Sequence, residues 1–327
     1  MNKSDDARWL TAAARLAARG RPLSRPNPAV GALIVKQNHV LARGWTQPGG
    51  RPHAEAIALA AAGEAARGAT LYVTLEPCAH ASPRGPACAD LVAASELARV
   101  VVGCGDPDPR TAGAGLTRIR AAGITTELLP SPEAEASLVG YLQRARLGRP
   151  HVTLKLAVSL DGRIALASGE SQWITGPEAR AHTHALRARA DAILVGGGTL
   201  RADNPQLDVR LPGLEDRSPE RWVLTRGNAP DGWRALPSPE ALVGFSDAQH
   251  LFIEGGAGAA AAFLTADLID TLLLYRAPIL IGNGLAAIGD IGLTSLATAH
   301  DRWRRTDSRR LGNDTLDVYE RTRCSPA

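Results

Sequence analysis

Lysine, cysteine, aromatic side chains and long apolar runs are all scarce in this chain of 327 residues. Four cysteines are too few for a disulfide framework, which predicts a reducing compartment, the cytoplasm. No apolar run approaches the roughly 18 residues that span a membrane, and the acidic start of the chain lacks the apolar core of a signal peptide. We therefore expect neither membrane insertion nor export.

Aromatic residues make up 4% of the chain, and 37 basic against 33 acidic residues give a net charge of +4. The excess is small and dispersed, and few aromatics are present for base stacking, so we expect no nucleic-acid partner. A small phosphorylated molecule suits this charge equally well. Only three of the basic residues are lysines, at positions 3, 36 and 155. Either Lys155 is retained for its chemistry or it survives by chance, and composition does not decide between the two.

One short stretch carries the most informative pattern, which consists of His53, Glu55, Cys78 and Cys88. An imidazole and two thiolates leave one position of tetrahedral Zn²⁺ open for a water, whose pKa the metal lowers toward ~7. Glu55 is close enough in sequence to His53 to move protons between that water and a leaving amine. The order of residues follows the signature of zinc nucleobase deaminases. It predicts His53, Cys78 and Cys88 as metal ligands and Glu55 as the catalytic acid and base.

The cysteine spacing departs from that signature, because nine residues separate Cys78 from Cys88 where about two are usual. Cys88 opens a helical pattern, and the N–H groups at a helix N-terminus favour a thiolate. Taken singly, each cysteine is more often a small buried apolar side chain, and His53 a surface histidine. Their joint occurrence in this order indicates a metal site.

Alternating strand and helix patterns predict an α/β fold in two domains, residues 1–147 and 148–327. The boundary follows a helical segment framed by prolines and glycine. In the first half the expected helices are 8–19, 53–66, 88–98 and 111–122, and the expected strands are 30–35, 69–75 and 99–104. In the second half the expected strands are 151–159, 191–196, 221–225, 251–254 and 270–275, and the expected helices are 177–189 and 257–266.

Two glycine clusters follow strand patterns in the second half, ILVGGGT at 193–199 and FIEGGA at 252–257. Bare backbone at a helix N-terminus can present N–H groups to a phosphate. Neither cluster is the G-x-G-x-x-G of a Rossmann fold, and tight turns explain both more simply. The clusters alone therefore leave phosphate binding open.

Four motifs in each half carry a resemblance to a known family. The first half has PNPAVG at 26–31, PHAE at 52–55, TLEPCAH at 74–80 and GDPDP at 105–109. The second half has KLAVSLDGR at 155–163, SGESQWIT at 168–175, ADNPQL at 202–207 and EGG at 254–256. In this order they resemble the bifunctional riboflavin-biosynthesis proteins, in which a pyrimidine deaminase is fused to a pyrimidine reductase. The resemblance implies a cytidine-deaminase-like three-layer domain followed by a dihydrofolate-reductase-like α/β domain.

For the first domain the resemblance implies zinc-dependent hydrolytic deamination of 2,5-diamino-6-ribosylamino-4(3H)-pyrimidinone 5′-phosphate. Asn27 matches the asparagine with which the family contacts the pyrimidine. His80 and Arg84 fall where the family binds the substrate and its phosphate, and a guanidinium suits a phosphate physically.

For the second domain the resemblance implies that NADPH reduces 5-amino-6-(5-phosphoribosylamino)uracil at the ribose C1′. The family match places the cofactor against Ala157, Trp173, Thr199, Asp203, Gly255 and Gly256. It places the substrate against Ser171, Arg187, Leu207, Arg210 and Glu254. Lys155 and Glu254 are the candidates for polarising the sugar. The family also implies a homo-oligomer, with dimers formed through the reductase domain.

Three features depart from the family pattern. The loop between the cysteines is one residue longer than usual, which shifts Arg84 by one position. Thr46 stands where the family often has a histidine, so one substrate contact is missing or replaced. The segment between Arg210 and Leu251 is short, which trims the pocket for the adenosine side of the cofactor.

These departures keep alternatives open. The second domain could be inactive, leaving a zinc deaminase with an appended non-catalytic domain. A deaminase of free or nucleic-acid bases and a catalytically silent binding protein with the same folds are further hypotheses. Bound zinc separates the silent protein from the enzymes, and NADPH binding separates the bifunctional enzyme from a deaminase alone.

Overall fold

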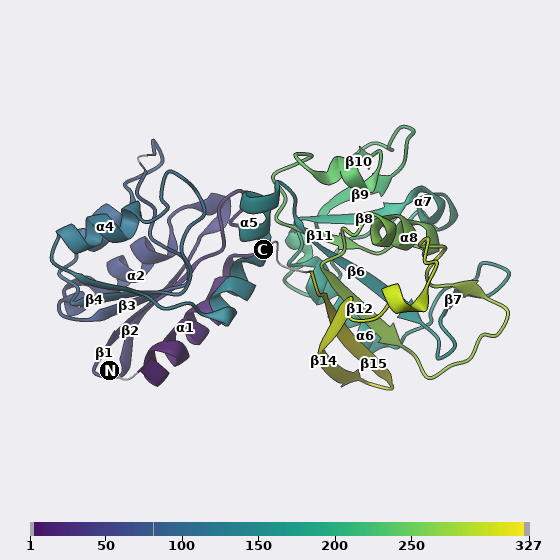
Figure 1. The fold of residues 1–327 in the computed structure, drawn as a ribbon, viewed down its shortest axis with the longest axis horizontal. Coiled ribbons are helices and arrows are strands. Elements are labelled where there is room, and N and C mark those ends of the chain that lie inside the picture. Colours follow the sequence, from purple (N-terminus) through teal and green to yellow (C-terminus); the bar gives the residue numbers. More distant parts are fainter. Residues whose placement is uncertain (1–2, 81, 324–327) are drawn as a thin grey trace. The chain divides into compact units, whose positions relative to one another are not determined.

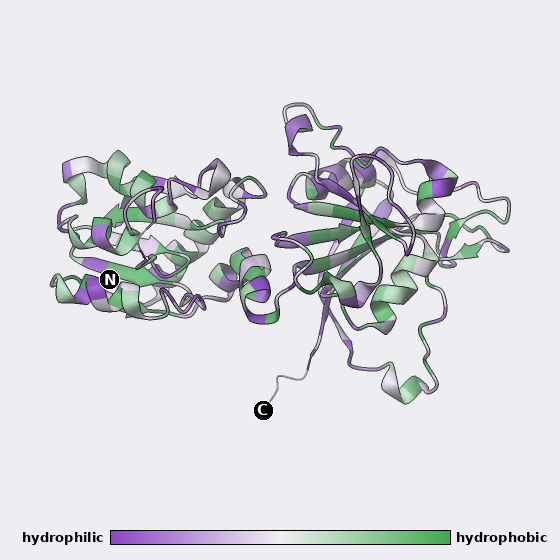
Figure 2. Ribbon diagram, turned by 90° about the horizontal axis from the view of Figure 1, so that it is seen from above, coloured by the Kyte–Doolittle hydropathy of each residue, from purple (hydrophilic) through white to green (hydrophobic). Residues whose placement is uncertain are grey.

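The computed structural model describes residues 3–80 and 82–323, and the chain divides into two units, residues 1–148 and 149–327 (Figure 1). Each unit has its own hydrophobic core on its own sheet, and hydrophobic residues are concentrated along the strands (Figure 2). Cys78, Cys88 and Cys104 are buried and unbridged, whereas Cys324 lies outside the described residues. No helix in the described part of the chain is long and apolar enough to cross a membrane.

The first unit is built on a five-stranded sheet with the strand order β2-β1-β3-β4-β5. Its strands are β1 (Gly31–Lys36), β2 (His39–Trp45), β3 (Thr70–Val73), β4 (Arg99–Val102) and β5 (Thr125–Leu128). β1 runs antiparallel to β2 and β3, and the last three strands are parallel. The hairpin of β1 and β2 therefore forms one edge of an otherwise parallel sheet.

Five helices cover the two faces of this sheet. They are α1 (Lys3–Ala17), α2 (Ala54–Ala62), α3 (Cys88–Ala93), α4 (Ala114–Ala121) and α5 (Pro132–Leu147). Side chains alternate along each strand, so Leu33 and Ile34 of β1 point to opposite faces. Leu33 packs in a cluster with residues of α1, which also contacts α5, while Ile34 packs in the cluster that α2, α3 and α4 share. The result is the three-layer arrangement that the sequence predicted.

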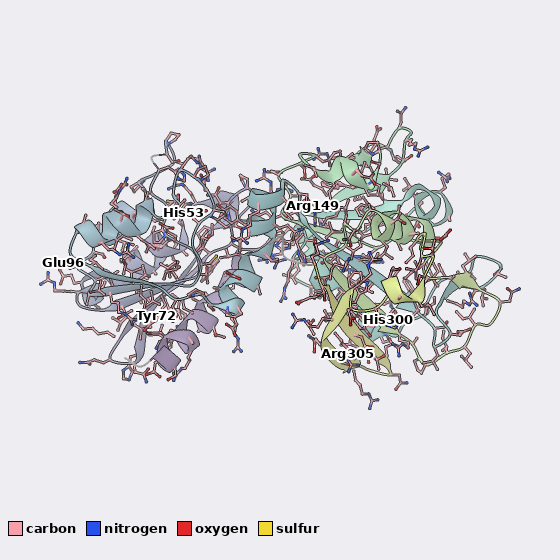
Figure 3. The ribbon with its side chains drawn as sticks, viewed as in Figure 1. His53, Tyr72, Glu96, Arg149, His300 and Arg305 are labelled. Atoms are coloured by element: carbon pink, nitrogen blue, oxygen red, sulfur yellow. The ribbon has the colours of Figure 1, made fainter. Side chains whose placement is uncertain are left out.

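A buried ionic network fastens α1 to the sheet. Asp6 is only 1% exposed and accepts from the hydroxyl of Tyr72, which points from β3 toward α1 (Figure 3). Arg99 of β4 donates to both carboxylate oxygens of Asp6 at 2.9 Å and also pairs with Glu127. Burial opposes ionisation of Asp6, but these hydrogen bonds hold the pKa of its carboxyl below its usual value.

Replacing Asp6 with alanine is expected to destabilise the first unit by about 3 kcal/mol, because it leaves the Arg99 guanidinium without its buried carboxylate. Hydrogen exchange of the β3 and β4 amides measures the loss locally. Glu127→Gln is the matched control, and since Glu127 is 35% exposed its loss should cost about 1 kcal/mol or less. A lowered carboxyl pKa also means that this stabilisation is complete above about pH 4 and is lost as the pH falls through the folded-state pKa. Equal protection in both variants would contradict the assignment.

The second unit is built on an eight-stranded sheet with the order β10-β9-β8-β11-β6-β12-β15-β14. Its strands are β6 (His151–Val158), β8 (Ala192–Gly196), β9 (Glu220–Leu224), β10 (Trp233–Leu236), β11 (His250–Ile253), β12 (Thr271–Arg276), β14 (Trp303–Leu311) and β15 (Asp314–Arg321). The strands from β10 to β12 are parallel, and β15 and β14 continue the sheet in antiparallel fashion. β7 (Arg163–Ala165) and β13 (Leu285–Ala286) form a separate small ladder. A buried ion pair between Arg149 and Asp270, 2.8 Å long, lies at the start of this unit (Figure 3).

Three helices belong to this unit, α6 (Pro177–Arg187), α7 (Gly197–Asp203) and α8 (Ala257–Thr265). Along β6 the buried Leu154 and Leu156 pack in one core cluster with residues of α8. Lys155 and Ala157 point to the opposite face, where Ala157 packs with residues of α6. Lys155 therefore lies on the face of the sheet that α6 covers.

Several elements were not predicted from the sequence, namely β2, β5, β7, β10, β13, β14, β15 and α7. β14 is an edge strand whose sequence WRRTDSRRL has no apolar alternation, because none of its residues is buried on either face. α7 begins with two glycines, which are poor helix formers, so the cluster at 193–199 looked like a turn. The helices expected over 53–66 and 88–98 are shorter, since α2 ends at Ala62 and α3 at Ala93.

Candidate active sites

Three predicted metal ligands converge in the first unit. His53 immediately precedes α2, Cys88 is the first residue of α3, and Cys78 lies in the loop after β3. His53 Nδ1 is 3.2 Å from Cys88 Sγ and 3.6 Å from Cys78 Sγ, and all three donor atoms lie within 4.8 Å of one another. Zinc bound to nitrogen and sulfur at about 2.0–2.3 Å requires donor separations of about 3.5 Å. The donor set and its spacing thus fit a tetrahedral zinc ion.

The surroundings of these ligands favour thiolate at Cys78. The Cys88 thiol, followed by His53 and the Cys88 backbone N–H, holds the pKa of the Cys78 thiol well below its usual range. Glu55, in the first turn of α2, is 3% exposed. Burial raises the pKa of Glu55 above its usual value. A buried carboxyl of this kind can hold or release a proton next to the ligand set.

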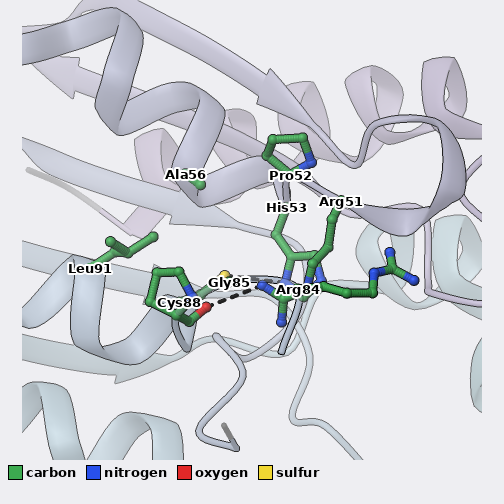
Figure 4. Close-up of a pocket in the computed structure, with 9 residues that line it drawn as sticks. Arg51, Pro52, His53, Ala56, Arg84, Gly85, Cys88 and Leu91 are labelled. Atoms are coloured by element: carbon green, nitrogen blue, oxygen red, sulfur yellow. Dashed lines mark hydrogen bonds between the residues drawn. The ribbon is translucent and has the colours of Figure 1, made fainter. Parts of the chain in front are cut away.

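A cavity of about 330 Å³ opens beside His53 and Cys88. Its walls include Arg51 and Arg84, which approach from the turn before α2 and from the loop between the cysteines (Figure 4). Asn27 and His80 are not among the described residues that line it. Asn27 lies just behind, with Nδ2 3.0 Å from His53 Nε2, and His80 Nδ1 is 3.5 Å from Thr111 Oγ1.

Two other residues, Thr46 and Glu76 of the motif at 74–80, hold the fold together. Thr46 is buried, and its hydroxyl oxygen accepts from the Val30 N–H at 2.9 Å, so this threonine supports the end of β2. Glu76 is buried as well, and its carboxylate accepts from the backbone N–H groups of Gly113 and Leu116 at the start of α4. That contact positions α4 against the loop that carries Cys78.

A second charged cluster lies in the second unit. The register of the parallel strands places Glu254, which follows β11, beside Lys155 of β6, with 3.8 Å between Glu254 Oε2 and Lys155 Nζ. Arg187, the last residue of α6, donates to both oxygens of Glu254 and to the Asp208 carbonyl. Burial opposes the charge on Glu254, but Lys155 and Arg187 hold the pKa of this carboxyl below its usual value. Burial lowers the pKa of Lys155.

The glycine clusters meet at the ends of β8 and β11. Gly256 precedes α8 and donates its N–H to the hydroxyl of Thr199 on α7 at 3.2 Å. A Cβ on Gly255 would lie 2.7 Å from that of Ala259, so this position requires glycine. The bare backbone before α8 is therefore shaped by its packing, and the Gly256 N–H already has the Thr199 hydroxyl as its partner.

Sequence and structure comparisons agree on what this chain resembles. The family model described as the cytidine and deoxycytidylate deaminase zinc-binding region matches residues 3–104, and that of the RibD C-terminal domain matches residues 150–236 and 239–316. The riboflavin biosynthesis protein RibD of Escherichia coli is 38% identical, with 94% of this chain and 97% of that protein covered. The RibD protein of Corynebacterium ammoniagenes is 40% identical over 82% of this chain and 84% of its own length.

Solved structures extend the likeness to three dimensions. The structure of Acinetobacter baumannii RibD, form 1, has a TM-score of 0.88 at 35% identity and covers 98% of this chain and 99% of its own. A Thermotoga maritima diaminohydroxyphosphoribosylaminopyrimidine deaminase/5-amino-6-(5-phosphoribosylamino)uracil reductase has a TM-score of 0.85 at 28% identity, with 97% of this chain and 99% of its own covered.

This chain belongs to the RibD family. RibD proteins are bifunctional enzymes of riboflavin biosynthesis that join a zinc-type deaminase to a reductase, so the family and fold class predicted from the motifs are confirmed. The family model of the RibD C-terminal domain accounts for most of the second half, and nothing here supports the alternative of an inactive second domain.

The remaining residues expected from the RibD resemblance are spread around the second cluster. Leu207 is buried and packs in the cluster that contains Ala157. Trp173 is 63% exposed, with the Arg180 guanidinium 4.8 Å from its ring centroid. Arg210 is exposed and pairs with Asp208. Ser171 is half-buried, and Asp203 is exposed at the end of α7.

Sequence reasoning missed three residues at these sites. Arg51 lies two positions before His53 in a glycine-proline turn, where an arginine is usually a solvated side chain. Tyr275 lies under Lys155, whose Nζ is 5.9 Å from the ring centroid, and His184 accepts from the Arg210 N–H. Only the strand pairing of β12 with β6 and the turn of α6 bring Tyr275 and His184 to the cluster.

Proposed function

We propose that this chain deaminates 2,5-diamino-6-ribosylamino-4(3H)-pyrimidinone 5′-phosphate in residues 1–147 and reduces 5-amino-6-(5-phosphoribosylamino)uracil to the ribitylamino product in residues 148–327. The observation that supports this most is the convergence of His53, Cys78 and Cys88 beside the buried Glu55. Membership of the RibD family supports the coupling of the two activities.

In the deaminase we propose that His53 Nδ1 and the sulfurs of Cys78 and Cys88 hold zinc. When bound, zinc supplies a water that is acidic enough to act as a nucleophile at neutral pH. Glu55 would carry protons from the nucleophilic water to the pyrimidine ring and to the departing ammonia, and burial raises the pKa of this carboxyl above its usual value. Asn27, held against His53 and the Gly50 carbonyl, orients the ring, and His80 and Arg84 contact the remainder of the substrate.

In the reductase we propose that the cofactor is NADPH, which supplies hydride to the ribose C1′. Ala157, Trp173, Thr199 and Asp203 contact the cofactor, and the backbone at Gly255 and Gly256 receives its phosphates. Lys155 and Glu254, which lie 3.8 Å apart, polarise the sugar.

The substrate phosphate in the reductase is assigned to Arg187 and Arg210. Arg187 already donates to both oxygens of Glu254 and to the Asp208 carbonyl, so we propose that it contacts the phosphate through its remaining N–H groups. Arg210 is exposed and its surface pair with Asp208 is weak, which leaves it available to an anion. Ser171 and Leu207 complete the proposed contacts.

We also propose a cytoplasmic enzyme that acts on small phosphorylated molecules and assembles as a homo-oligomer through its reductase units. Buried free thiols at Cys78 and Cys88 support a reducing compartment, because oxidation would remove both proposed ligands. Sedimentation of the purified chain tests the assembly.

The deciding experiment supplies the zinc-loaded chain with the diamino-pyrimidinone ribosyl phosphate and follows released ammonia together with NADPH absorbance. We expect ammonia first and then one NADPH consumed for each ammonia released. Ammonia with no loss of NADPH, even when the deaminated intermediate is supplied directly, would mean that the second domain is not a reductase. If zinc-loaded protein releases no ammonia and consumes no NADPH, the proposed function is wrong.

A further inference from the structure

Two arginines close the cavity beside the proposed zinc ligands from opposite sides. Arg51 precedes Pro52 and His53, and its Nη1 donates to the carbonyl of Pro86 across the cavity at 3.2 Å (Figure 4). Arg84 lies in the loop between the cysteines, and its Nη2 donates in the reverse direction to the carbonyl of Gly49. Each guanidinium therefore reaches from its own side of the opening to a backbone carbonyl on the other.

Neither arginine has a carboxylate partner among the described residues. Some arginines at this unit's surface do have such a partner, since Arg67 pairs with Glu96 and Arg110 pairs with Asp108. A neutral carbonyl accepts one N–H of a guanidinium and leaves the positive charge of the guanidinium unbalanced. A phosphate accepts two N–H groups and neutralises that charge. Two unpaired guanidinium groups at the mouth of one cavity therefore favour a dianion over the carbonyls that hold them.

Arg51 is also fixed relative to the metal ligands. Its backbone is extended, with φ −148° and ψ 150°, and one proline separates it from His53. The residue before a proline is largely confined to this conformation. The backbone of Arg51 is consequently set relative to His53, and a phosphate bound by its side chain would lie in the cavity that both residues line.

We propose that Arg51 is a phosphate-binding residue of the deaminase and determines its preference for the 5′-phosphorylated substrate. The inference rests on the proposed function and assigns a residue that the motifs did not. On binding, the phosphate replaces the Pro86 carbonyl as the partner of Arg51 and the Gly49 carbonyl as the partner of Arg84. The turn before α2 and the loop between the cysteines then share one anion.

The test compares the steady-state kinetics of ammonia release for the phosphorylated substrate and for the same compound without its phosphate. Arg51→Gln is expected to raise KM for the phosphorylated substrate about 10- to 100-fold, the range for loss of a charge-assisted pair, with kcat changed less than about threefold. KM for the dephosphorylated compound should not change. Arg51→Lys keeps the charge but not the paired N–H geometry, so its KM for the phosphorylated substrate should lie between those of the wild type and Arg51→Gln. Arg43→Gln removes an exposed arginine from β2 in the same unit and is the matched control.

A purely structural role for Arg51 predicts something different. Loss of its bond to Pro86 would then loosen the loop, change kcat and KM alike for both compounds and lower the bound zinc, and that result would overturn the proposal. An unchanged KM in Arg51→Gln would overturn it as well. Inorganic phosphate provides a second readout, because it should inhibit the wild type competitively and inhibit Arg51→Gln at least about tenfold more weakly. Failure of the wild type to release ammonia would instead count against the proposed function.

Discussion

Replacing Glu55 with glutamine is expected to lower kcat for ammonia release by about 10³-fold, within the range of about 10²–10⁴ that a positioned acid and base contributes. Glutamine has the same shape as the buried glutamate but cannot take up a proton from water and pass it to a leaving amine. The three proposed metal ligands stay in place, so the variant should bind as much zinc as the wild type. Ammonia release and metal content, measured on the same preparation, check both statements.

The controls for Glu55 use the independence of the two activities. Glu64→Gln changes an exposed glutamate of the same unit and should leave ammonia release within about twofold of the wild type. NADPH oxidation by Glu55→Gln should be unaffected when the deaminated intermediate is supplied directly. Chelation should abolish ammonia release in the wild type, and added zinc should restore it there but not in the variant. A variant within about tenfold of the wild type would rule out Glu55 as the proton carrier.

Replacing Lys155 with methionine is expected to lower kcat for NADPH oxidation by about 10²- to 10³-fold, because the substrate loses the ammonium group proposed to polarise its sugar. The fold should survive, since Arg187 still donates to both oxygens of the buried Glu254 carboxylate. Methionine also fills the space of the lysine stem against Tyr275. Stopped-flow absorbance with the deaminated intermediate and excess NADPH measures the step.

The scarcity of lysine makes a clean control available. Lys36→Met removes the lysine of β1, whose ammonium group donates to the Arg67 carbonyl at the surface of the first unit. It should change neither activity. If Lys155→Met oxidises NADPH at the wild-type rate, the lysine is a structural partner of Glu254, and the polarising role falls to other residues.

The proposed metal ligands, which the structure brings within 4.8 Å of one another, could be picked out from sequence because their chemistry limits the choice of residue. Few functions other than metal binding require a histidine, a nearby glutamate and two cysteines in this order, even with an unusual loop. Arg51 could not be found in the same way, because an arginine in a turn is common and its partner Pro86 is 35 residues away. Its role depends on a cavity, and a cavity has no sequence pattern.

The strands also differ in whether a local sequence pattern predicts them. Buried strands such as β1 and β8 were predicted because nearly all their residues are apolar. Edge strands such as β2 and β14 were not, because each has one unpaired side and several exposed positions. Lys155 and Glu254 were predicted through the family resemblance, but their separation of 3.8 Å follows from strand register, which no local pattern specifies.

The strand order of the second unit also shows where the chain can be shortened without moving Lys155 and Glu254. Lys155 and Glu254 lie on β6 and directly after β11, which are neighbours near the middle of the sheet, whereas β9 and β10 form one edge. Residues 225–249, which include β10, therefore lie away from the charged cluster in the sheet order. Deletions there shorten an edge and leave the spacing of the central strands unchanged. A shorter segment at this edge is therefore compatible with an unchanged register between β6 and β11 and an unchanged Lys155–Glu254 separation of 3.8 Å.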